Sequence, residues 1–170
     1  FYGGKTLDSL GPIRGVLERL PSVQKVVVVP YVVSNPDLSS VPEAVTFGDF
    51  GRPGTPLEFT RVEFDAPLYV MYSSGTTGVP KCIVHGVGGT LLQHLKEHLL
   101  HTDLKPDDRL FFFTTCGWMM WNWLVSGLAT GCTVVLYEGS PFAPDRDVLW
   151  RLAERERVTA FGTSPKYLSA

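Results

Sequence analysis

The stretch Lys25–Val33 is a nearly unbroken run of β-branched residues, and it restricts the possible folds more than any other part of the sequence. β-Branched side chains favour extended backbone. Because polar residues do not alternate with apolar ones, the strand predicted here should be covered on both faces, as in a parallel sheet flanked by helices. In the preceding segment, Leu10–Leu20, apolar residues recur at helical spacing, which predicts a helix that ends before Pro21.

The rest of the chain continues this alternation of helices and strands. Apolar runs predict strands at Leu68–Tyr72, Cys82–His85, Arg109–Thr115, Thr133–Tyr137 and Val158–Phe161, and helical patterns predict helices at Gly89–His101, Trp118–Ala129 and Asp145–Arg157. Ser34–Arg61 is rich in Pro and Gly, has no sustained period and is interpreted as a connecting segment. The alternation predicts an α/β fold with a largely parallel sheet.

Composition excludes several classes of partner. A chain of 170 residues that is 44% hydrophobic and 19% charged has the composition of a globular protein and about the length of one domain. The 15 basic and 17 acidic residues are mixed along it, without the basic block that nucleic acid or an anionic membrane attracts. No apolar run approaches the roughly 20 residues of a membrane span. We therefore expect neither nucleic acid nor membrane as a partner, and nothing indicates an obligate protein partner.

The cysteines and the ends of the chain give two further expectations. Cys82, Cys116 and Cys132 lie among apolar residues without a Cys-x-x-Cys pair, which predicts reduced core thiols and a cytosolic (cytoplasmic) location. The chain begins with Phe1 and no signal peptide pattern, and Lys166–Ala170 is typical of a helix that has just begun. These features predict an internal piece of a longer protein.

A glycine-rich loop follows the predicted strand at Leu68–Tyr72. Ser73–Lys81 contains two Ser, two Thr, two Gly and one Lys. Glycines let backbone N–H groups approach an anion, hydroxyls add neutral donors and lysine adds positive charge, so the loop suits a polyphosphate. It is not a Walker A loop, because Val79 and Pro80 separate Gly78 from Lys81. The residue types alone leave a plain polar turn as an equal alternative.

The order of the residues in Tyr72–Lys81 resembles the signature loop of the adenylate-forming superfamily, which includes acyl-CoA synthetases, peptide-synthetase adenylation domains and luciferases. In that family the loop holds the β- and γ-phosphates of ATP while a carboxylate attacks the α-phosphate. The resemblance implies ATP with Mg²⁺ as cofactor and coenzyme A as co-substrate. It assigns phosphate binding to Ser73, Ser74, Gly75, Thr76, Thr77, Gly78 and Lys81, with the catalytic positive charge on Lys81.

A second segment, Trp118–Trp123, contains three Trp, two Met and one Asn. Bulky residues at helical spacing usually form a core helix, and we keep that interpretation for Trp121 and Trp123. Asn122 is different, because a buried amide needs partners and could donate to a ligand oxygen. By resemblance to acyl-CoA synthetases, this segment shapes an acyl and pantetheine pocket. The residues assigned to the pocket are Trp118, Met119, Met120 and Asn122; acetyl-CoA synthetases carry smaller residues where Met119 and Met120 stand.

Three runs, Gly117–Trp123, Gly89–His98 and Leu136–Pro141, resemble one branch of the family, the acetoacetyl-CoA synthetases. This resemblance implies ligation of acetoacetate to coenzyme A through an acyl adenylate, with the small molecules acetoacetate, ATP and CoA as partners. Residues 1–170 are then an internal portion of the large N-terminal AMP-binding domain, an α/β structure of layered sheets flanked by helices.

The resemblance also limits what this piece can do. The family's adenine- and ribose-binding motifs and its C-terminal catalytic domain do not occur before Ala170, so residues 1–170 alone should be inactive. Two alternatives stay open. One is a synthetase for another short acid, and the other is a non-catalytic module that binds nucleotide phosphates.

The histidines do not indicate a metal site. His94, His98 and His101 have helical spacing beside Lys96 and Glu97, and no set of Cys or carboxylate ligands completes a site. We interpret them as part of a solvated helix face. His85 either helps to position the glycine-rich loop or belongs to the core.

Overall fold

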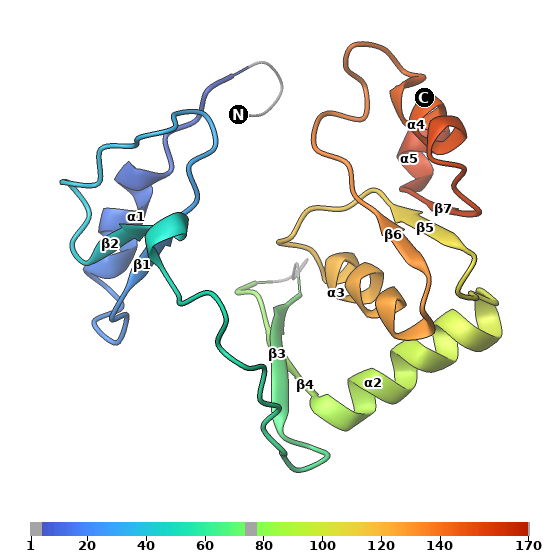
Figure 1. Cartoon of the computed structure of the whole chain (residues 1–170), viewed down its shortest axis with the longest axis horizontal. Helices are drawn as coiled ribbons and strands as arrows, with labels where there is room; N and C mark the ends of the chain where they lie inside the picture. Colours follow the sequence, from blue (N-terminus) through green and yellow to red (C-terminus); the bar gives the residue numbers. More distant parts are fainter. Residues whose placement is uncertain (1–4, 74–77, 170) are drawn as a thin grey trace. The chain divides into compact units, whose positions relative to one another are not determined.

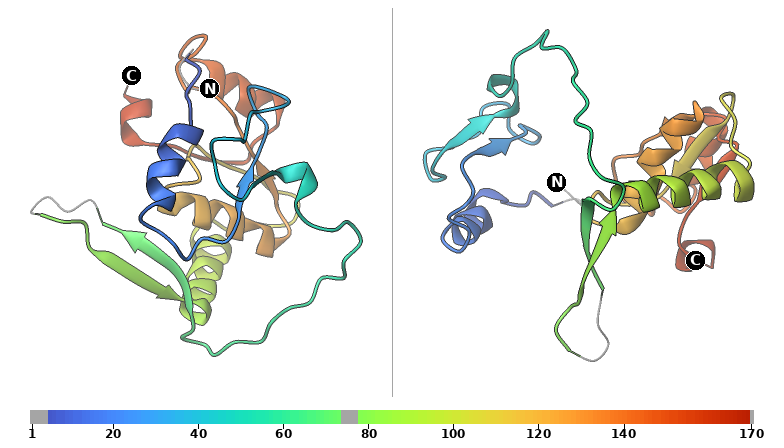
Figure 2. Two further views of the ribbon diagram at one scale, coloured as in Figure 1. Left: turned by 90° about the vertical axis from the view of Figure 1, so that its left-hand side faces the viewer. Right: turned by 90° about the horizontal axis from the view of Figure 1, so that it is seen from below.

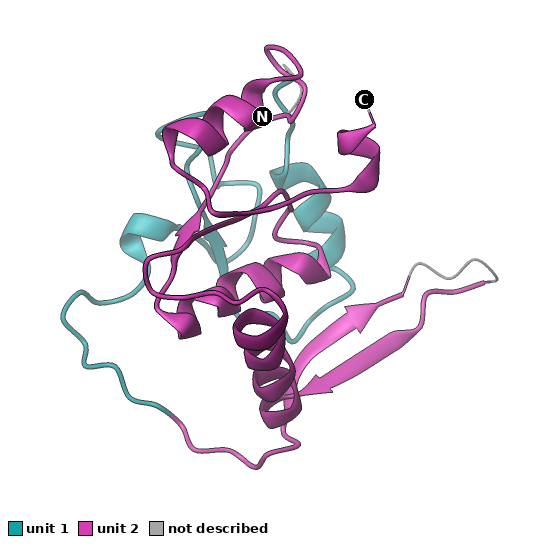
Figure 3. Cartoon of the chain, turned by 90° about the vertical axis from the view of Figure 1, so that its right-hand side faces the viewer, with its two compact units in different colours: residues 1–59 teal, residues 60–170 magenta. Residues whose placement is uncertain are grey.

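The computed structural model describes residues 5–73 and 78–169. The chain forms two compact units, residues 1–59 and residues 60–170, which are coloured separately in Figure 3 and treated separately below. Figure 1 labels the helices and strands along the chain.

The first unit is a helix followed by a small parallel sheet of two strands. Helix α1 (Leu10–Leu17) precedes strand β1 (Val26–Val28), which pairs in parallel with β2 (Ala44–Thr46), and a 3₁₀ turn, η1 (Phe47–Asp49), follows. An ion pair of 3.1 Å between Lys25 and Glu43 lies beside the first pairing of the two strands.

Two sequence predictions for this unit need correction. The strand expected over Lys25–Val33 ends at Val28, because Pro30 has no N–H for a strand ladder. Its remaining apolar residues, including Val29 and Val33, are exposed, so the described chain does not cover both faces of this run. Strand β2 lies within the presumed connecting segment Ser34–Arg61, because three residues are too few to show a period.

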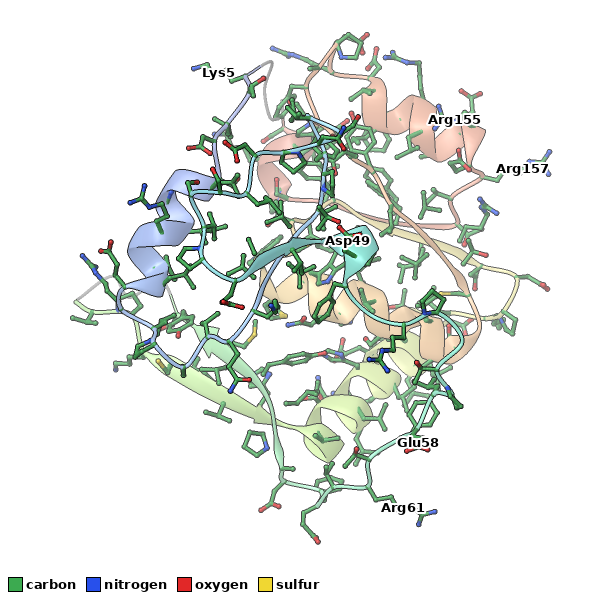
Figure 4. The ribbon with its side chains drawn as sticks, turned by 60° about the vertical axis from the view of Figure 1, so that its left-hand side comes forward. Lys5, Asp49, Glu58, Arg61, Arg155 and Arg157 are labelled. Atoms are coloured by element: carbon green, nitrogen blue, oxygen red, sulfur yellow. The ribbon has the colours of Figure 1, made fainter. Side chains whose placement is uncertain are left out.

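The chain from residue 51 to residue 65 has no helix or strand and is exposed. Glu58 and Arg61 lie in this stretch, and Figure 4 shows the Arg61 side chain pointing away from the ribbon. Asp49 lies just before this stretch, at the end of η1, where its backbone N–H donates to the Thr46 hydroxyl at 3.3 Å.

The second unit begins with a hairpin. Strands β3 (Pro67–Tyr72) and β4 (Cys82–Gly86) pair antiparallel, and α2 (Val87–Lys96) follows, continued by a π-helical turn, η2 (Glu97–His101). The Gly88 N–H donates to the Phe64 carbonyl at 2.8 Å, where the base of the hairpin meets α2. A Cβ on Gly88 would lie 2.1 Å from the Phe64 ring, so only glycine fits this close approach.

A parallel sheet of three strands forms the rest of the unit. Strand β5 (Arg109–Phe112) lies between β6 (Thr133–Val135) and β7 (Ala160–Gly162). The connections contain α3 (Met119–Ser126) with the 3₁₀ turn η3 (Gly127–Thr130), and α4 (Val148–Arg155); the short helix α5 (Pro165–Leu168) follows β7.

Side chains of β5 alternate between two cores, one on each face of this sheet. Leu110 packs with Leu124 of α3, whereas Phe111 packs with Leu149 of α4 and Tyr167 of α5. The sheet therefore has helices on both faces, which is the layered arrangement that the sequence predicted.

The cysteine prediction holds only in part. Cys132 is buried in the core beside Leu110, but Cys82 and Cys116 are exposed, and all three are free thiols.

The α/β class is confirmed, while the single largely parallel sheet is not. The described strands form three small sheets, of which β1–β2 and β6–β5–β7 are parallel and the β3–β4 hairpin is antiparallel. The nine residues of Ser73–Lys81 are too short for a crossover between parallel strands, so the two flanking strands pair as a hairpin.

Gly162 should be intolerant of a side chain. It pairs with Phe112, and an added Cβ would lie 2.1 Å from the Phe112 ring. We expect Gly162→Ala to lower the free energy of unfolding by about 1–3 kcal/mol, the usual cost of overpacking a core. Thermal unfolding of the intact protein checks this. Gly15→Ala is the control, because nothing lies within 4 Å of a Cβ there, and equal melting temperatures for the two variants would contradict the packing argument.

Candidate functional site

The glycine-rich loop joins the two strands of the hairpin. Tyr72 pairs with Cys82, and beyond this pair the Ser73 N–H donates to the Lys81 carbonyl at 3.0 Å. The Lys81 N–H lies 3.4 Å from the Ser73 hydroxyl. Ser73 and Lys81, the first and last residues of the predicted phosphate loop, therefore face each other at the end of the ladder. Ser74, Gly75, Thr76 and Thr77 lie outside the described residues.

The described part of the loop is open to solvent. Gly78 has a φ of +150°, a conformation that favours glycine. Val79 is 87% exposed, and Lys81 is exposed as well. Figure 2 shows the two strands running from α2 out toward this loop. Lys81 is thus exposed at the end of the hairpin, where an anionic ligand can reach its side chain.

The predicted acyl segment begins after the short loop that follows β5, and Trp118 is the residue that precedes α3. Trp118 is 50% exposed and Met119 is 42% exposed, whereas Met120 is half-buried. Trp121 and Trp123 pack against the core of Leu110 and Leu124, as predicted. Helix α3 thus has one face in the core and leaves two large apolar side chains at its start for another contact.

Asn122 connects the two predicted sites. Its Nδ2 donates to the Sδ of Met71 at 3.5 Å, a weak hydrogen bond to a thioether. Met71 lies two residues before Ser73 on β3, so the acyl segment touches the strand that leads into the phosphate loop. Among the described residues, the second N–H of this amide has no other acceptor. Sequence reasoning did not identify Met71, since nothing in a short apolar run marks one residue as a contact.

The segment before Trp118 lies at the carboxyl edge of the parallel sheet. Helix α3, after β5, packs in the core on one face, and α5, after the neighbouring β7, packs in the core on the other. In open α/β sheets, ligands bind outside the carboxyl ends of two neighbouring strands whose following helices lie on opposite faces of the sheet. Thr163, just after β7, has a buried hydroxyl with no hydrogen-bond partner among the described residues, and no local sequence pattern marks this residue.

The solvated-face interpretation of the histidines is wrong for His98, which is 0% exposed. Its Nε2 lies 3.0 Å from the Trp123 carbonyl oxygen and 2.9 Å from the Ser126 hydroxyl. Burial is the main cause that lowers the pKa of His98, and burial also lowers the pKa of half-buried His94. His101 is exposed as expected. Helical spacing could not separate these cases, because a neutral imidazole can be satisfied inside a core.

Other sites are few in the described residues. Across 5–73 and 78–169, no group of three His, Cys, Asp or Glu side chains is placed to hold a metal ion, and no helix there is long and apolar enough to span a membrane. A cavity of about 450 Å³ in the first unit contains none of the predicted site residues; those that line it include Arg14, Leu17, Lys25 and Glu43.

Comparison with known families identifies the chain. Residues 9–170 match the family described as AMP-binding enzyme, which is nearly the whole sequence. The chain belongs to the AMP-binding enzyme family. The glycine-rich loop at the end of the hairpin and the segment with exposed Trp and Met side chains both lie within the matched residues.

Individual AMP-binding enzymes resemble the chain over its whole length. An acetoacetyl-coenzyme A synthetase of Rhizobium meliloti (strain 1021) is 54% identical, with 100% of this chain and 26% of that protein covered. A malonamoyl-CoA synthetase of Penicillium aethiopicum is 46% identical, with coverages of 99% and 26%. The solved structure of an acetoacetyl-CoA synthetase from Streptomyces lividans matches with a TM-score of 0.88 and 45% identity, again over 99% and 26%. The chain spans about a quarter of the length of these relatives.

Proposed function

We propose that residues 1–170 are part of a ligase that joins acetoacetate to coenzyme A with the consumption of ATP. The observation that carries this proposal is the 54% identity, over the full chain, to a protein named acetoacetyl-coenzyme A synthetase. The Streptomyces structure, with a TM-score of 0.88, supports the same assignment.

In the first step, a carboxylate oxygen of acetoacetate attacks the α-phosphorus of ATP. The bond from that phosphorus to the oxygen bridging to the β-phosphate breaks, and pyrophosphate leaves with the charge. Both reactants are anions, so the protein must hold them together and reduce their repulsion. ATP enters as its Mg²⁺ complex, and the ion reaches the site with the phosphates. Ser73–Gly78 donate hydrogen bonds to the β- and γ-phosphates, and Lys81 supplies positive charge.

In the second step, the sulfur of coenzyme A attacks the acyl carbon of the adenylate. A C–S bond forms, the C–O bond to AMP breaks, and the thiol proton is lost to solvent. Trp118, Met119 and Met120 enclose the acyl group and the end of the pantetheine arm. Asn122, with one N–H on Met71, directs its other N–H to an oxygen of the acyl group. The position of Trp118 after the carboxyl end of β5 supports this role.

We further propose that residues 1–170 belong to the N-terminal domain of this ligase. The groups that bind adenine and ribose, and those that complete the second step, then lie in the rest of the protein. The coverage of about a quarter of each relative supports this division. Residues 1–170 alone should not catalyse either step.

A synthetase for a different short acid is the second candidate. This candidate is supported by the 46% identity to a malonamoyl-CoA synthetase, because the name of that relative specifies an acid other than acetoacetate. The two candidates share both chemical steps and differ in the pocket at Trp118–Asn122. The order of preference among acids therefore decides between them.

The direct test of the function is exchange of labelled pyrophosphate into ATP by the intact protein. We expect exchange that depends on acetoacetate and is faster than with acetate or butyrate. Lys81→Ala should slow exchange by roughly 10- to 100-fold, since a hydrogen bond to a charged group contributes about 1.5–3 kcal/mol. Lys5→Ala removes the same charge from an exposed position in the first unit and serves as the control. No exchange with any short carboxylate would refute the ligase, and full activity of Lys81→Ala would refute the role of the loop.

Acid preference should depend on Met119 and Met120. A change of one methylene in an apolar pocket alters discrimination by about 1–3 kcal/mol, so Met119→Val and Met120→Thr should redistribute kcat/KM among acetoacetate, acetate and butyrate by about tenfold. Leu128→Val, at an exposed apolar position on η3, is the control. Ratios that stay at the parent values in both variants would show that the two Met side chains do not line the pocket.

A further inference from the structure

His98 makes a donor contact to helix α3 from inside the core. The Trp123 carbonyl can only accept, and the Ser126 hydroxyl donates its own proton to that carbonyl at 2.7 Å. Both neighbours of Nε2 are therefore acceptors toward it, at 3.0 and 2.9 Å. The proton of the neutral ring must lie on Nε2, which donates to the last turn of α3.

The other ring nitrogen explains why His98 is neutral. Nδ1 is buried and has no hydrogen-bond partner among the described residues. A proton on Nδ1 would place a donor and a charge in the core without an acceptor, which is costly. Burial lowers the pKa of His98, and nearby His94 lowers it further, while the Trp123 carbonyl and Glu97 act in the opposite direction. Helix α3 itself contributes no ionisable side chain.

A chain of aromatic rings leads from His98 to the proposed acyl pocket. The centroid of the His98 ring is 4.4 Å from that of Trp123, and Trp123 is 5.9 Å from Phe112. Phe112 in turn is 6.2 Å from Trp118. The backbone of Gly162 closes the other side of Phe112, because a single Cβ there would overlap the ring. Phe112 therefore has little room to move independently of its neighbours.

We infer that His98 is a positioning residue for acid selectivity, which fixes α3 through Trp123 and, through Phe112, the orientation of the Trp118 ring in the acyl pocket. This inference rests on the proposed function. It requires no contact between His98 and substrate. Closely packed rings take up discrete arrangements, so a lost hydrogen bond at one end can change the pocket at the other.

The first test compares His98→Leu with His98→Gln in the intact protein. Leu removes the donor, and Gln keeps an N–H that can reach the Trp123 carbonyl. For Leu, the ratio of kcat/KM for acetoacetate to that for butyrate should fall about three- to tenfold, while the KM for ATP is unchanged; the coupling of distant residues to a site has this size. Gln should restore the ratio to within about twofold of the parent. An unchanged ratio in His98→Leu overturns the inference.

Ser126→Ala is the second variant, in case His98→Leu does not fold. It removes one acceptor of Nε2 with little change in volume and leaves the Trp123 carbonyl in place, so it should lower the same ratio by a smaller factor than His98→Leu. If a folded Ser126→Ala protein has the same acetoacetate-to-butyrate ratio of kcat/KM as the parent, the inference is overturned.

A double-mutant cycle tests the aromatic chain itself. In a Trp118→Phe background, the effect of His98→Leu on the acid ratio should largely disappear, because the ring that transmits it has changed. Strictly additive effects would overturn the transmission through Phe112. A simple loss of stability would not produce this dependence on Trp118.

The pH profile provides a readout that packing alone would not change. Because the pKa of His98 is lowered, the ring stays neutral until the pH falls below its ordinary value of about 6.5. Further acidification should then lower the acid ratio of the parent, whereas His98→Gln should show no such decline. Identical profiles would contradict the role assigned to His98.

Hydrogen exchange of the backbone separates this inference from the proposed function. In His98→Leu, amides of residues 119–126 should exchange faster than in the parent, and in His98→Gln they should not. If the parent showed no exchange of pyrophosphate with any short acid, the proposed function would fail while this measurement still decided whether His98 fixes α3. Equal protection in all three proteins overturns the inference.

Discussion

The pairing of β5 between β6 and β7 is the constraint on which the rest of the second unit depends. Leu110 and Phe111 are consecutive, so they fill opposite cores, and each core holds the helices on its face. A strand buried on both sides has its register determined twice, since a slip by one residue would exchange the two sets of side chains. The end of β5 is therefore well positioned, and Trp118 follows it after a short loop.

The two elements of the candidate site are linked by the contact between Asn122 and Met71. One side of that contact belongs to α3, which is fixed to the sheet by Leu124 and to the π-helical turn by His98. The other side belongs to β3, whose hairpin is fixed at its base where Gly88 meets Phe64. The predicted phosphate loop and the proposed acid pocket thus extend from one connected structure. This arrangement suits a reaction in which a carboxylate must approach a phosphorus atom closely.

Much of the second unit could be predicted from its sequence, and most of what could not depends on contacts between distant residues. Apolar runs such as Leu68–Tyr72 were correctly predicted as strands, and the loop order at Ser73–Lys81 indicated the family that the comparison then showed. The strand predicted over Lys25–Val33 was too long, because Pro30 ends the strand despite the β-propensity of its neighbours. The surface position predicted for His98 was wrong, because its helical spacing is compatible with a core position as well as with a surface position. The contact of Met71 with Asn122 joins residues 51 apart, which no local pattern reveals.

We propose that this chain is part of a ligase in which a carboxylate oxygen of acetoacetate attacks the α-phosphorus of ATP. The most direct measurement uses acetoacetate labelled with ¹⁸O in its carboxylate, with the intact protein, ATP and coenzyme A. Because the attacking oxygen stays on phosphorus when the thiol displaces the nucleotide, the AMP formed should carry one labelled oxygen and the pyrophosphate none. Unlabelled AMP, or label recovered in inorganic phosphate with ADP as the nucleotide product, would contradict the account.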